Sequence, residues 1–308
     1  MDYLGYFGLR EPPFGITPDT SFFCSHRSID EALNTLHFAV STGEGFIKIT
    51  GEVGTGKTLL CRRFLASLPD GCVAAYIPNP NASPRALLAM IAVELGCRVG
   101  RRNQPEYRTL ESFSQHLIEI AINERLIEIA DGGGRAVICI DEAQAMPIAA
   151  LETVRLLSNL ETEKRKLLQV ILFGQPELDH KLMQPEIRQL RQRITFEYAL
   201  DPLSREDVSH YLSHRLVVAG YAGGGMFSGA AARTIYRASR GIPRLVNILA
   251  HKTMLLAYGR GRRAVKWRDA CAAVRDTPSA WRFPRSWFHF GSTAIIGFWA
   301  AAIGRTMP

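Results

Sequence analysis

The residues from Gly51 to Thr58 follow the pattern G-x-x-x-x-G-K-[ST] at every fixed position. Glycines let such a loop turn tightly, so that several backbone N–H groups point at one anion at the start of a helix. The lysine, Lys57, would reach the β- and γ-phosphates of a nucleotide, and the Thr58 hydroxyl would bind Mg²⁺. The pattern therefore predicts a site for ATP and Mg²⁺ made by Gly51, Glu52, Val53, Gly54, Thr55, Gly56, Lys57, Thr58 and Leu59.

Two adjacent carboxylates, Asp141 and Glu142, directly follow the apolar run 135–140. In open α/β folds, ligands bind where parallel strands end, so both acids are expected near the phosphates. We expect Asp141 to hold Mg²⁺ together with Thr58, and Glu142 to polarise a water for attack on the γ-phosphate. This pairing predicts hydrolysis, although an ATP-binding switch that hydrolyses too slowly to be a motor stays open.

Two further residues are candidates for the same site. Gln175 ends another apolar run and would orient the attacking water beside Glu142, or else cap the turn before Pro176. Arg244 follows Gly241-Ile242-Pro243 and stands on the first turn of a predicted helix. It would bind the γ-phosphate, so that the nucleotide state sets the angle between two domains, or else be a surface arginine.

Three arginines, Arg188, Arg191 and Arg193, precede the last predicted strand. An arginine there can reach the nucleotide of a neighbouring subunit and stabilise the charge of the transition state. Arg193 and Arg191 are the favoured pair and Arg188 is third, with pairing to nearby glutamates as the structural alternative. The pattern favours a homo-oligomer, either a ring or a nucleotide-dependent assembly.

The elements that must position these residues alternate along the chain. Short runs rich in β-branched residues predict five strands, at 46–50, 73–77, 136–140, 168–173 and 194–199, and helical patterns lie at 83–96, 109–130 and 148–163. Such runs suit strands that are buried on both faces of a parallel sheet. The alternation predicts an α/β fold, a P-loop NTPase with a three-layer αβα core and a five-stranded parallel sheet.

Strand patterns stop after residue 200, and helical patterns follow at 204–219, 228–239 and 243–258. They predict a small all-α lid domain. The expected organisation is an N-terminal segment at 1–29, the nucleotide-binding core at 30–200, the lid at 201–275, a linker at 276–286 and a candidate C-terminal membrane helix at 287–304.

The net charge of +8 is unevenly distributed. Residues 201–308 carry 16 Lys+Arg and 5 Asp+Glu, whereas residues 1–200 carry 21 and 24. The excess is densest at Arg260, Arg262, Arg263, Lys266 and Arg268. This cluster would attract nucleic acid or an anionic membrane surface, or would simply be a solvated surface.

Cysteine spacing and two terminal segments bear on the cellular compartment in which the protein works. The six cysteines include no C-x-x-C pair, which favours reduced thiols over zinc or disulfides. Residues 1–13 lack the basic start and apolar run of a signal peptide. The segment 287–304 has no Lys, Arg, Asp or Glu, and it is either a short membrane span, with Trp287 and Trp299 as interfacial anchors, or a helix docked on the protein.

The combined motifs resemble the AAA+ ATPase superfamily over roughly residues 30–258. A closer likeness lies in longer phrases, among them YFGLREPPF at 6–14, DEAQAMP at 141–147, RLLSNLE at 155–161 and FGQPEL at 173–178. These phrases are similar to the ExeA/GspA family of general-secretion ATPases, and above all to members that assemble the mannose-sensitive haemagglutinin (MSHA) pilus.

The resemblance implies an ATPase on the cytoplasmic face of the bacterial inner membrane, which assists membrane proteins in assembling a type II secretion or type IV pilus machine. It implies the roles given above for Lys57, Thr58, Asp141, Glu142, Gln175 and Arg244. Family members carry a transmembrane segment and then a periplasmic peptidoglycan-binding domain, whereas this sequence stops just past its apolar segment. A partner protein is therefore expected to supply any contact with the cell wall.

A rival interpretation comes from the same superfamily. A DNA-transposition helper would bind DNA through the basic C-terminal half, and its affinity would fall steeply with salt. Nucleic acid is the less favoured partner, because the basic cluster shows no fixed contact geometry.

Overall fold

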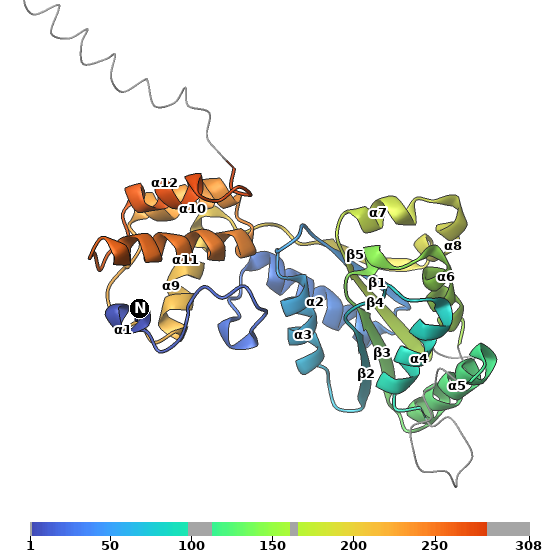
Figure 1. Cartoon of the computed structure of the whole chain (residues 1–308). Coiled ribbons are helices and arrows are strands. Elements are labelled where there is room, and N and C mark those ends of the chain that lie inside the picture. The colour runs from blue at the N-terminus through green and yellow to red at the C-terminus, as the bar shows by residue number, and fades with distance from the viewer. Residues whose placement is uncertain (1, 98–112, 161–165, 282–308) are drawn as a thin grey trace, which may run out of the picture. The chain divides into compact units, whose positions relative to one another are not determined.

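The computed structural model describes residues 2–97, 113–160 and 166–281, and it divides the chain into two compact units (Figure 1). One unit comprises Gly15–Leu203 together with Ile242–Arg244, and it contains the sheet. The other comprises the N-terminal residues up to Phe14, Ser204–Gly241 and the described residues from Leu245 onward. Since their mutual placement is not determined, each unit is described by itself.

The sheet has five parallel strands in the order β2-β3-β4-β1-β5. They are β1 (Phe46–Thr50), β2 (Cys72–Ile77), β3 (Arg135–Ile140), β4 (Leu168–Gly174) and β5 (Ile194–Ala199). The predicted five-stranded parallel sheet is therefore confirmed. Because β3, β4 and β1 are neighbours and point the same way, the residues that follow these three strands meet at one edge of the sheet.

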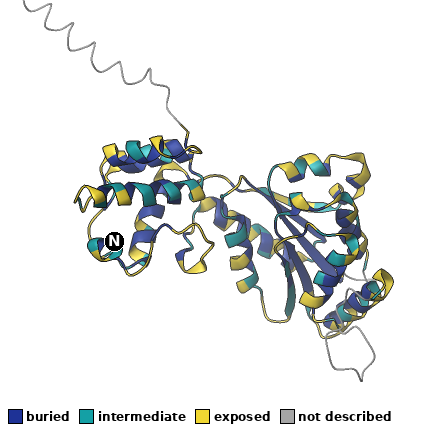
Figure 2. Cartoon of the chain, viewed as in Figure 1, coloured by how far each residue is buried: buried dark blue, intermediate teal, exposed yellow. Residues whose placement is uncertain are grey.

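Helices cover both faces of the sheet. On one face lie α2 (Arg27–Thr42) and α3 (Lys57–Ala66), and on the other lie α4 (Pro84–Glu94), α5 (Gln115–Asp131) and α6 (Ile148–Leu157). Strand β3 shows the alternation clearly, since Val137 packs toward α2 and α3 whereas Ile138 packs toward α4 and α5. The three-layer αβα arrangement is confirmed, and the central strands β1, β3 and β4 are buried between the helices, whereas the edge strands β2 and β5 are partly exposed (Figure 2).

Local signals set several helix ends. Ser83 caps α4, where its hydroxyl accepts a hydrogen bond from Ala86 N at 3.3 Å and Pro84 takes the first helical position. Helix α2 ends at Gly43, whose φ of 79° suits a glycine. The helical pattern predicted at 83–96 agrees with α4 to within two residues at each end.

Two predicted helices differ in extent from the observed ones. Helix α6 ends at Leu157 rather than at residue 163, because the Ser158 hydroxyl donates to Arg155 O at 2.7 Å and Leu167 N donates to Leu160 O at 3.1 Å. That second bond brings the chain back toward β4. Helix α5 begins at Gln115 rather than at residue 109, and residues 109–112 lie outside the described part of the chain.

The helical unit contains α1 (Tyr3–Phe7), α9 (Arg205–Val218), α10 (Gly229–Ser239), most of α11 (Pro243–Gly259) and α12 (Trp267–Arg275). The bounds of α9, α10 and α11 agree with the predicted helices to within one residue. Helix α12 was not predicted as a separate element. Its first turn is held by Asp269, whose carboxylate accepts from Lys266 N at 3.0 Å.

The N-terminal residues pack on this helical unit. Arg10 N donates to Ala219 O at 2.8 Å, the Arg215 guanidinium donates to Pro13 O, and the rings of Tyr6 and Tyr258 meet edge to face. These contacts join residues more than 200 positions apart. The sequence predicted residues 1–29 only as an N-terminal segment and gave no sign of this packing.

No helix in the described ranges is both long enough and apolar enough to cross a bilayer. The candidate membrane segment 287–304 and the predicted linker beyond residue 281 lie outside those ranges.

Candidate active site

The loop between β1 and α3 has a shape that requires glycine. Gly54 and Gly56 have φ values of 86° and 103°, in the region that other residues rarely adopt. A Cβ atom on Gly54 would lie 2.6 Å from the Cβ atom of Arg244, whose backbone N donates to Gly54 O at 3.1 Å. Arg244 thus lies directly against the loop, in the same compact unit, and it is exposed to solvent.

The remaining loop residues hold this shape. Thr55 is buried, and both its N–H and its hydroxyl donate to Glu52 O, at 3.2 and 2.9 Å. Gly51 N donates to Gly174 O at 3.2 Å, which ties the loop to the end of β4. Val53 is exposed at the tip, and Leu59 stands on the first turn of α3.

Lys57 lies buried at the start of α3 with its ammonium group folded over the loop. The Nζ atom donates to Gly51 O at 2.6 Å and to Glu52 O at 3.0 Å. Burial lowers the pKa of Lys57, and the nearby carboxylates of Glu142 and Asp141 oppose that shift. A buried cation held by neutral carbonyls is well suited to bind an anionic phosphate, which would offset the cost of burying the charge.

Thr58 and Asp141 meet across the gap between α3 and the end of β3. The Thr58 hydroxyl donates to Asp141 Oδ2 at 2.6 Å, and Glu142 N donates to Asp141 Oδ1 at 2.9 Å. Burial raises the pKa of Asp141, while these two hydrogen bonds act against the rise. A hydroxyl and a carboxylate at this distance are oxygen ligands that suit Mg²⁺, which takes one or two carboxylates and completes its shell with water and phosphate oxygens. The residues present therefore fit MgATP.

The structure brings Glu142 and Gln175 into direct contact. Gln175 Nε2 donates to Glu142 Oε2 at 2.9 Å. The contact follows from the sheet order, because Glu142 follows β3 and Gln175 follows the adjacent strand β4. This geometry suits an amide that orients the catalytic carboxylate or its water.

Sequence reasoning missed two residues of this site. Gln144 lies in the short 3₁₀ turn Ala143–Ala145, and its amide also donates to Glu142 Oε2. Lys181, on α7 (Glu177–Leu182), donates to the backbone oxygens of Gln144 and Met146. The only sequence signal that could have identified Gln144 as a site residue is its position two residues after Glu142.

The three candidate finger arginines differ in their surroundings. Arg193 is half-buried, and its guanidinium donates to Ser158 Oγ at 2.9 Å and to Arg155 O at 3.4 Å. Arg188 and Arg191 begin and end α8 (Arg188–Arg191), and both are exposed. Within one protomer, Arg193 thus braces the end of α6.

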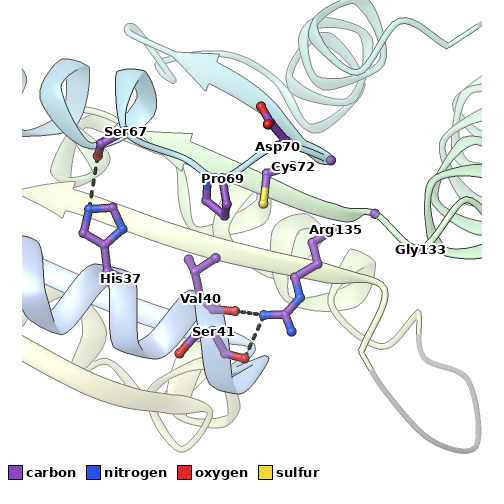
Figure 3. A pocket seen from close by; sticks show the side chains of 11 residues that line it. His37, Val40, Ser41, Ser67, Pro69, Asp70, Cys72, Gly133 and Arg135 are labelled. Atoms are coloured by element: carbon purple, nitrogen blue, oxygen red, sulfur yellow. Dashed lines mark hydrogen bonds between the residues drawn. The ribbon is translucent and has the colours of Figure 1, made fainter.

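A separate hollow of about 490 Å³ lies at the opposite edge of the sheet, where β2 and β3 begin (Figure 3). The Arg135 guanidinium donates to Val40 O and, at 2.8 Å, to Ser41 O, and the His37 ring lies 3.1 Å from Ser67 Oγ. Arg135 therefore caps the C-terminal end of α2, where a positive charge is favourable. The hollow is lined by other residues than the predicted site residues.

Comparisons with known proteins identify relatives of this chain. Residues 40–182 match the model of the AAA domain family. The chain is 39% identical over 302 residues to general secretion pathway protein A of Aeromonas hydrophila, a match that covers 98% of this chain and 53% of the relative. The chain thus spans about half the length of that curated relative.

Solved structures share the fold at low sequence identity. Cdc6p from Pyrobaculum aerophilum aligns with a TM-score of 0.63 at 20% identity, covering 84% of this chain and 70% of its own. ORC2 from Aeropyrum pernix gives 0.62 at 14% identity, covering 87% and 73%. The RuvB Holliday junction branch migration motor of Thermotoga maritima gives 0.55 at 15% identity, covering 85% and 73%. At these identities the likeness shows the AAA+ fold alone.

Proposed function

This chain belongs to the AAA+ ATPases and is related to general secretion pathway protein A, and we propose that it uses ATP hydrolysis to drive or regulate assembly of a bacterial type II secretion or type IV pilus machine. The observation that carries the proposal is the 39% identity along 98% of the chain, together with a site whose residues fit MgATP. An MSHA-like pilus is the specific machine that we propose, from the phrases shared with that branch of the family.

Each residue of the site has its own role in the proposed hydrolysis. Lys57 would bind the phosphates, and Thr58 and Asp141 would hold the metal, while Glu142 accepts a proton from the attacking water and Gln175 keeps that carboxylate in place. When bound, MgATP would supply the phosphoryl group that is transferred to water, with ADP as the leaving group.

The test of the proposed function is complementation in the source bacterium. A strain that lacks the gene should lose surface pili or secreted proteins, and the wild-type chain should restore them. Glu142→Gln should fail to restore them although it accumulates to the same level, because removal of a general base typically lowers turnover by about 10² to 10⁴-fold. Normal pili and normal secretion in the deletion strain would exclude this function.

We further propose that the protein works at the cytoplasmic face of the inner membrane, through contact of residues 287–304 with the bilayer or with a membrane partner. The support is compositional, since this segment contains no charged residue. Fractionation of cells that express the chain with and without residues 287–308 tests this location. If both forms distribute equally into the membrane fraction, the segment is not an anchor.

The structure does not favour the rival function in DNA transposition. Arg260 and Arg262 both pair with the buried carboxylate of Asp269, and the guanidinium of Arg263 lies 5.6 Å from the ring centre of Tyr6. Much of the basic cluster therefore stabilises its own unit. A salt titration with duplex DNA separates the two functions, because tight and steeply salt-dependent binding would support the transposition helper instead.

A further inference from the structure

The carboxylate of Glu142 is held by two amide side chains. Gln175 Nε2 and Gln144 Nε2 both donate to the same oxygen, Oε2. Among the described residues, these side-chain contacts of Glu142 all fall on Oε2, so that Oε1 is the oxygen that can accept a proton from water. A base anchored through one oxygen presents the other in a fixed direction.

The network also determines which way the Gln144 amide faces. Its Oε1 accepts a hydrogen bond from Gln175 N at 3.1 Å, so its Nε2 must point to Glu142. With the amide turned around, an oxygen would face the carboxylate and an NH₂ group would face a backbone N–H. Gln144 therefore connects the ends of β3 and β4 through a single side chain.

The backbone at Glu142 is strained, and the same turn maintains the strain. Glu142 has a φ of 53°, a left-handed conformation that is unfavourable for a non-glycine residue. Ala145 N donates to Glu142 O at 2.8 Å, and Lys181 Nζ donates to Met146 O at 2.6 Å. Since Lys181 also binds the backbone oxygen of Gln144, the turn has a support that is independent of the Gln144 side chain.

The end of β4 leaves room for the Gln144 amide. A Cβ atom on Gly174 would lie 2.6 Å from Leu178 Cδ2 and 3.4 Å from Gln144 Oε1. A side chain there would clash with Leu178, whereas the Gln144 amide would lie at an ordinary contact distance from it. Gly174 thus lets Leu178 pack closely against the end of β4, beside the Gln144 amide.

We propose that Gln144 is a positioning residue for hydrolysis, which anchors Glu142 through Oε2 so that Oε1 faces the attacking water. The inference deepens the proposed function and rests on the role given there to Glu142. Positioning matters because a displacement of about 1 Å in a reacting group can cost about 100-fold in rate.

The first test replaces Gln144 by methionine, which keeps the length of the side chain and removes both of its hydrogen bonds. We expect kcat to fall by roughly 10- to 100-fold while ATP affinity stays within about two-fold, since Glu142 acts on the attacking water and the phosphates are bound by other residues. Gln115→Met is the matched control, because Gln115 also donates to a glutamate, Glu119, at 2.8 Å, but is exposed at the start of α5. A kcat for Gln144→Met that equals or exceeds that of wild type overturns the proposal.

The second test asks whether Gln144 acts through Glu142. In a Glu142→Gln background, adding Gln144→Met should leave the residual rate unchanged, whereas a general structural role would lower it further. If Gln144→Met does not fold, Gln144→Asn in the same two backgrounds replaces it, because its shorter amide cannot span both partners. A further loss of rate in the Glu142→Gln background overturns the proposal.

These experiments also separate this inference from the proposed function. If Glu142→Gln hydrolyses ATP at the wild-type rate, the role of Glu142 itself is wrong. If Glu142→Gln is inactive while Gln144→Met is fully active, only the positioning role of Gln144 is wrong.

Discussion

The ammonium group of Lys57 is buried and held by two loop carbonyls, so its charge is available to a phosphate at little cost in rearrangement. We expect Lys57→Met to weaken MgATP binding by about 10- to 100-fold, because hydrogen bonds to charged groups contribute about 1.5–3 kcal/mol. Titration with a fluorescent ATP analogue measures the change. Lys252→Met is the control, since Lys252 pairs with Asp276 in the helical unit, and unchanged affinity for Lys57→Met would contradict the assigned role.

The burial of Asp141 lowers the stability of the fold, because it disfavours the ionised carboxylate and raises the pKa of Asp141. A carboxyl group whose pKa is higher in the folded state destabilises the fold at every pH where it is ionised, and the penalty vanishes below the unfolded value. We expect Asp141→Asn without nucleotide to be more stable at pH 7.5 by about 1 kcal/mol, a typical gain when a functional site is relaxed, and to lose Mg²⁺-dependent hydrolysis.

Urea unfolding of both proteins at pH 7.5 and pH 5 measures this effect. The advantage of Asp141→Asn should shrink at the lower pH, as the wild-type carboxyl group takes up its proton in the folded state. A variant that is less stable than wild type at pH 7.5 would show that the bonds from Thr58 and from Glu142 N outweigh the cost of burial.

At the scale of elements, the loop between β1 and α3 depends on close approach as well as on backbone conformation. Gly54 combines a φ of 86° with a neighbour that a Cβ atom would meet at 2.6 Å, whereas Gly43 at the end of α2 has a φ of 79° and open space around it. We expect Gly43→Ala to cost about 1–2 kcal/mol, the price of a left-handed backbone alone. Gly54→Ala should cost more and should also abolish ATP binding.

Urea unfolding and ATP titration of the two alanine variants check this comparison. Equal losses of stability would mean that Arg244 moves away from the loop easily, and that the contact between them contributes little.

The predicted positions of helices and strands were accurate where the sequence signals are local. Strand β5 and helix α9 agree with their predicted positions because their signals are local, a short β-branched run in one case and the capping serine Ser204 in the other. Helix α6 ends early because the Ser158 hydroxyl binds Arg155 O in its last turn and because Leu160 O accepts a hydrogen bond from Leu167 N, which depends on the return of the chain to β4. A periodic apolar pattern contains no information about that return.

At the scale of the whole molecule, we propose that one subunit completes the site of its neighbour. Arg191 is exposed at the end of α8, whereas Arg193 already binds Ser158 within its own protomer. We expect Arg191→Ala to lower kcat by about 10³-fold or more, as the loss of an arginine finger does. Mixing it with inactive Glu142→Gln should restore activity, because under random assembly about a quarter of the interfaces would pair an intact Glu142 with an intact Arg191.

The rate of ATP hydrolysis at different mixing ratios measures this complementation. The double variant Glu142→Gln/Arg191→Ala is the control, since it supplies no arginine to the Arg191→Ala sites. If the mixture stays inactive, Arg191 does not act in trans, and the same experiment with Arg193→Ala then tests the other favoured arginine.

The sequence by itself determined the chemistry of the phosphate loop, the acidic pair Asp141-Glu142 and the parallel α/β core. Each is a short segment whose residue types are dictated by local demands: glycine where φ is positive, a lysine and a hydroxyl at the start of a helix, apolar runs in buried strands. Each of these local requirements restricts the residue type at one position, so it can be recognised from the sequence alone.

Only the tertiary structure decided what these segments contact. The sheet order places the end of β3 beside the end of β4, and this adjacency gives Glu142 its two amide partners and gives Gln144 its proposed role. Tertiary packing likewise places the N-terminal residues on α9 in the helical unit, through Arg10 and Arg215. These contacts join residues far apart in the chain, and their energy depends on the distances between side chains, which no local pattern of residue types contains.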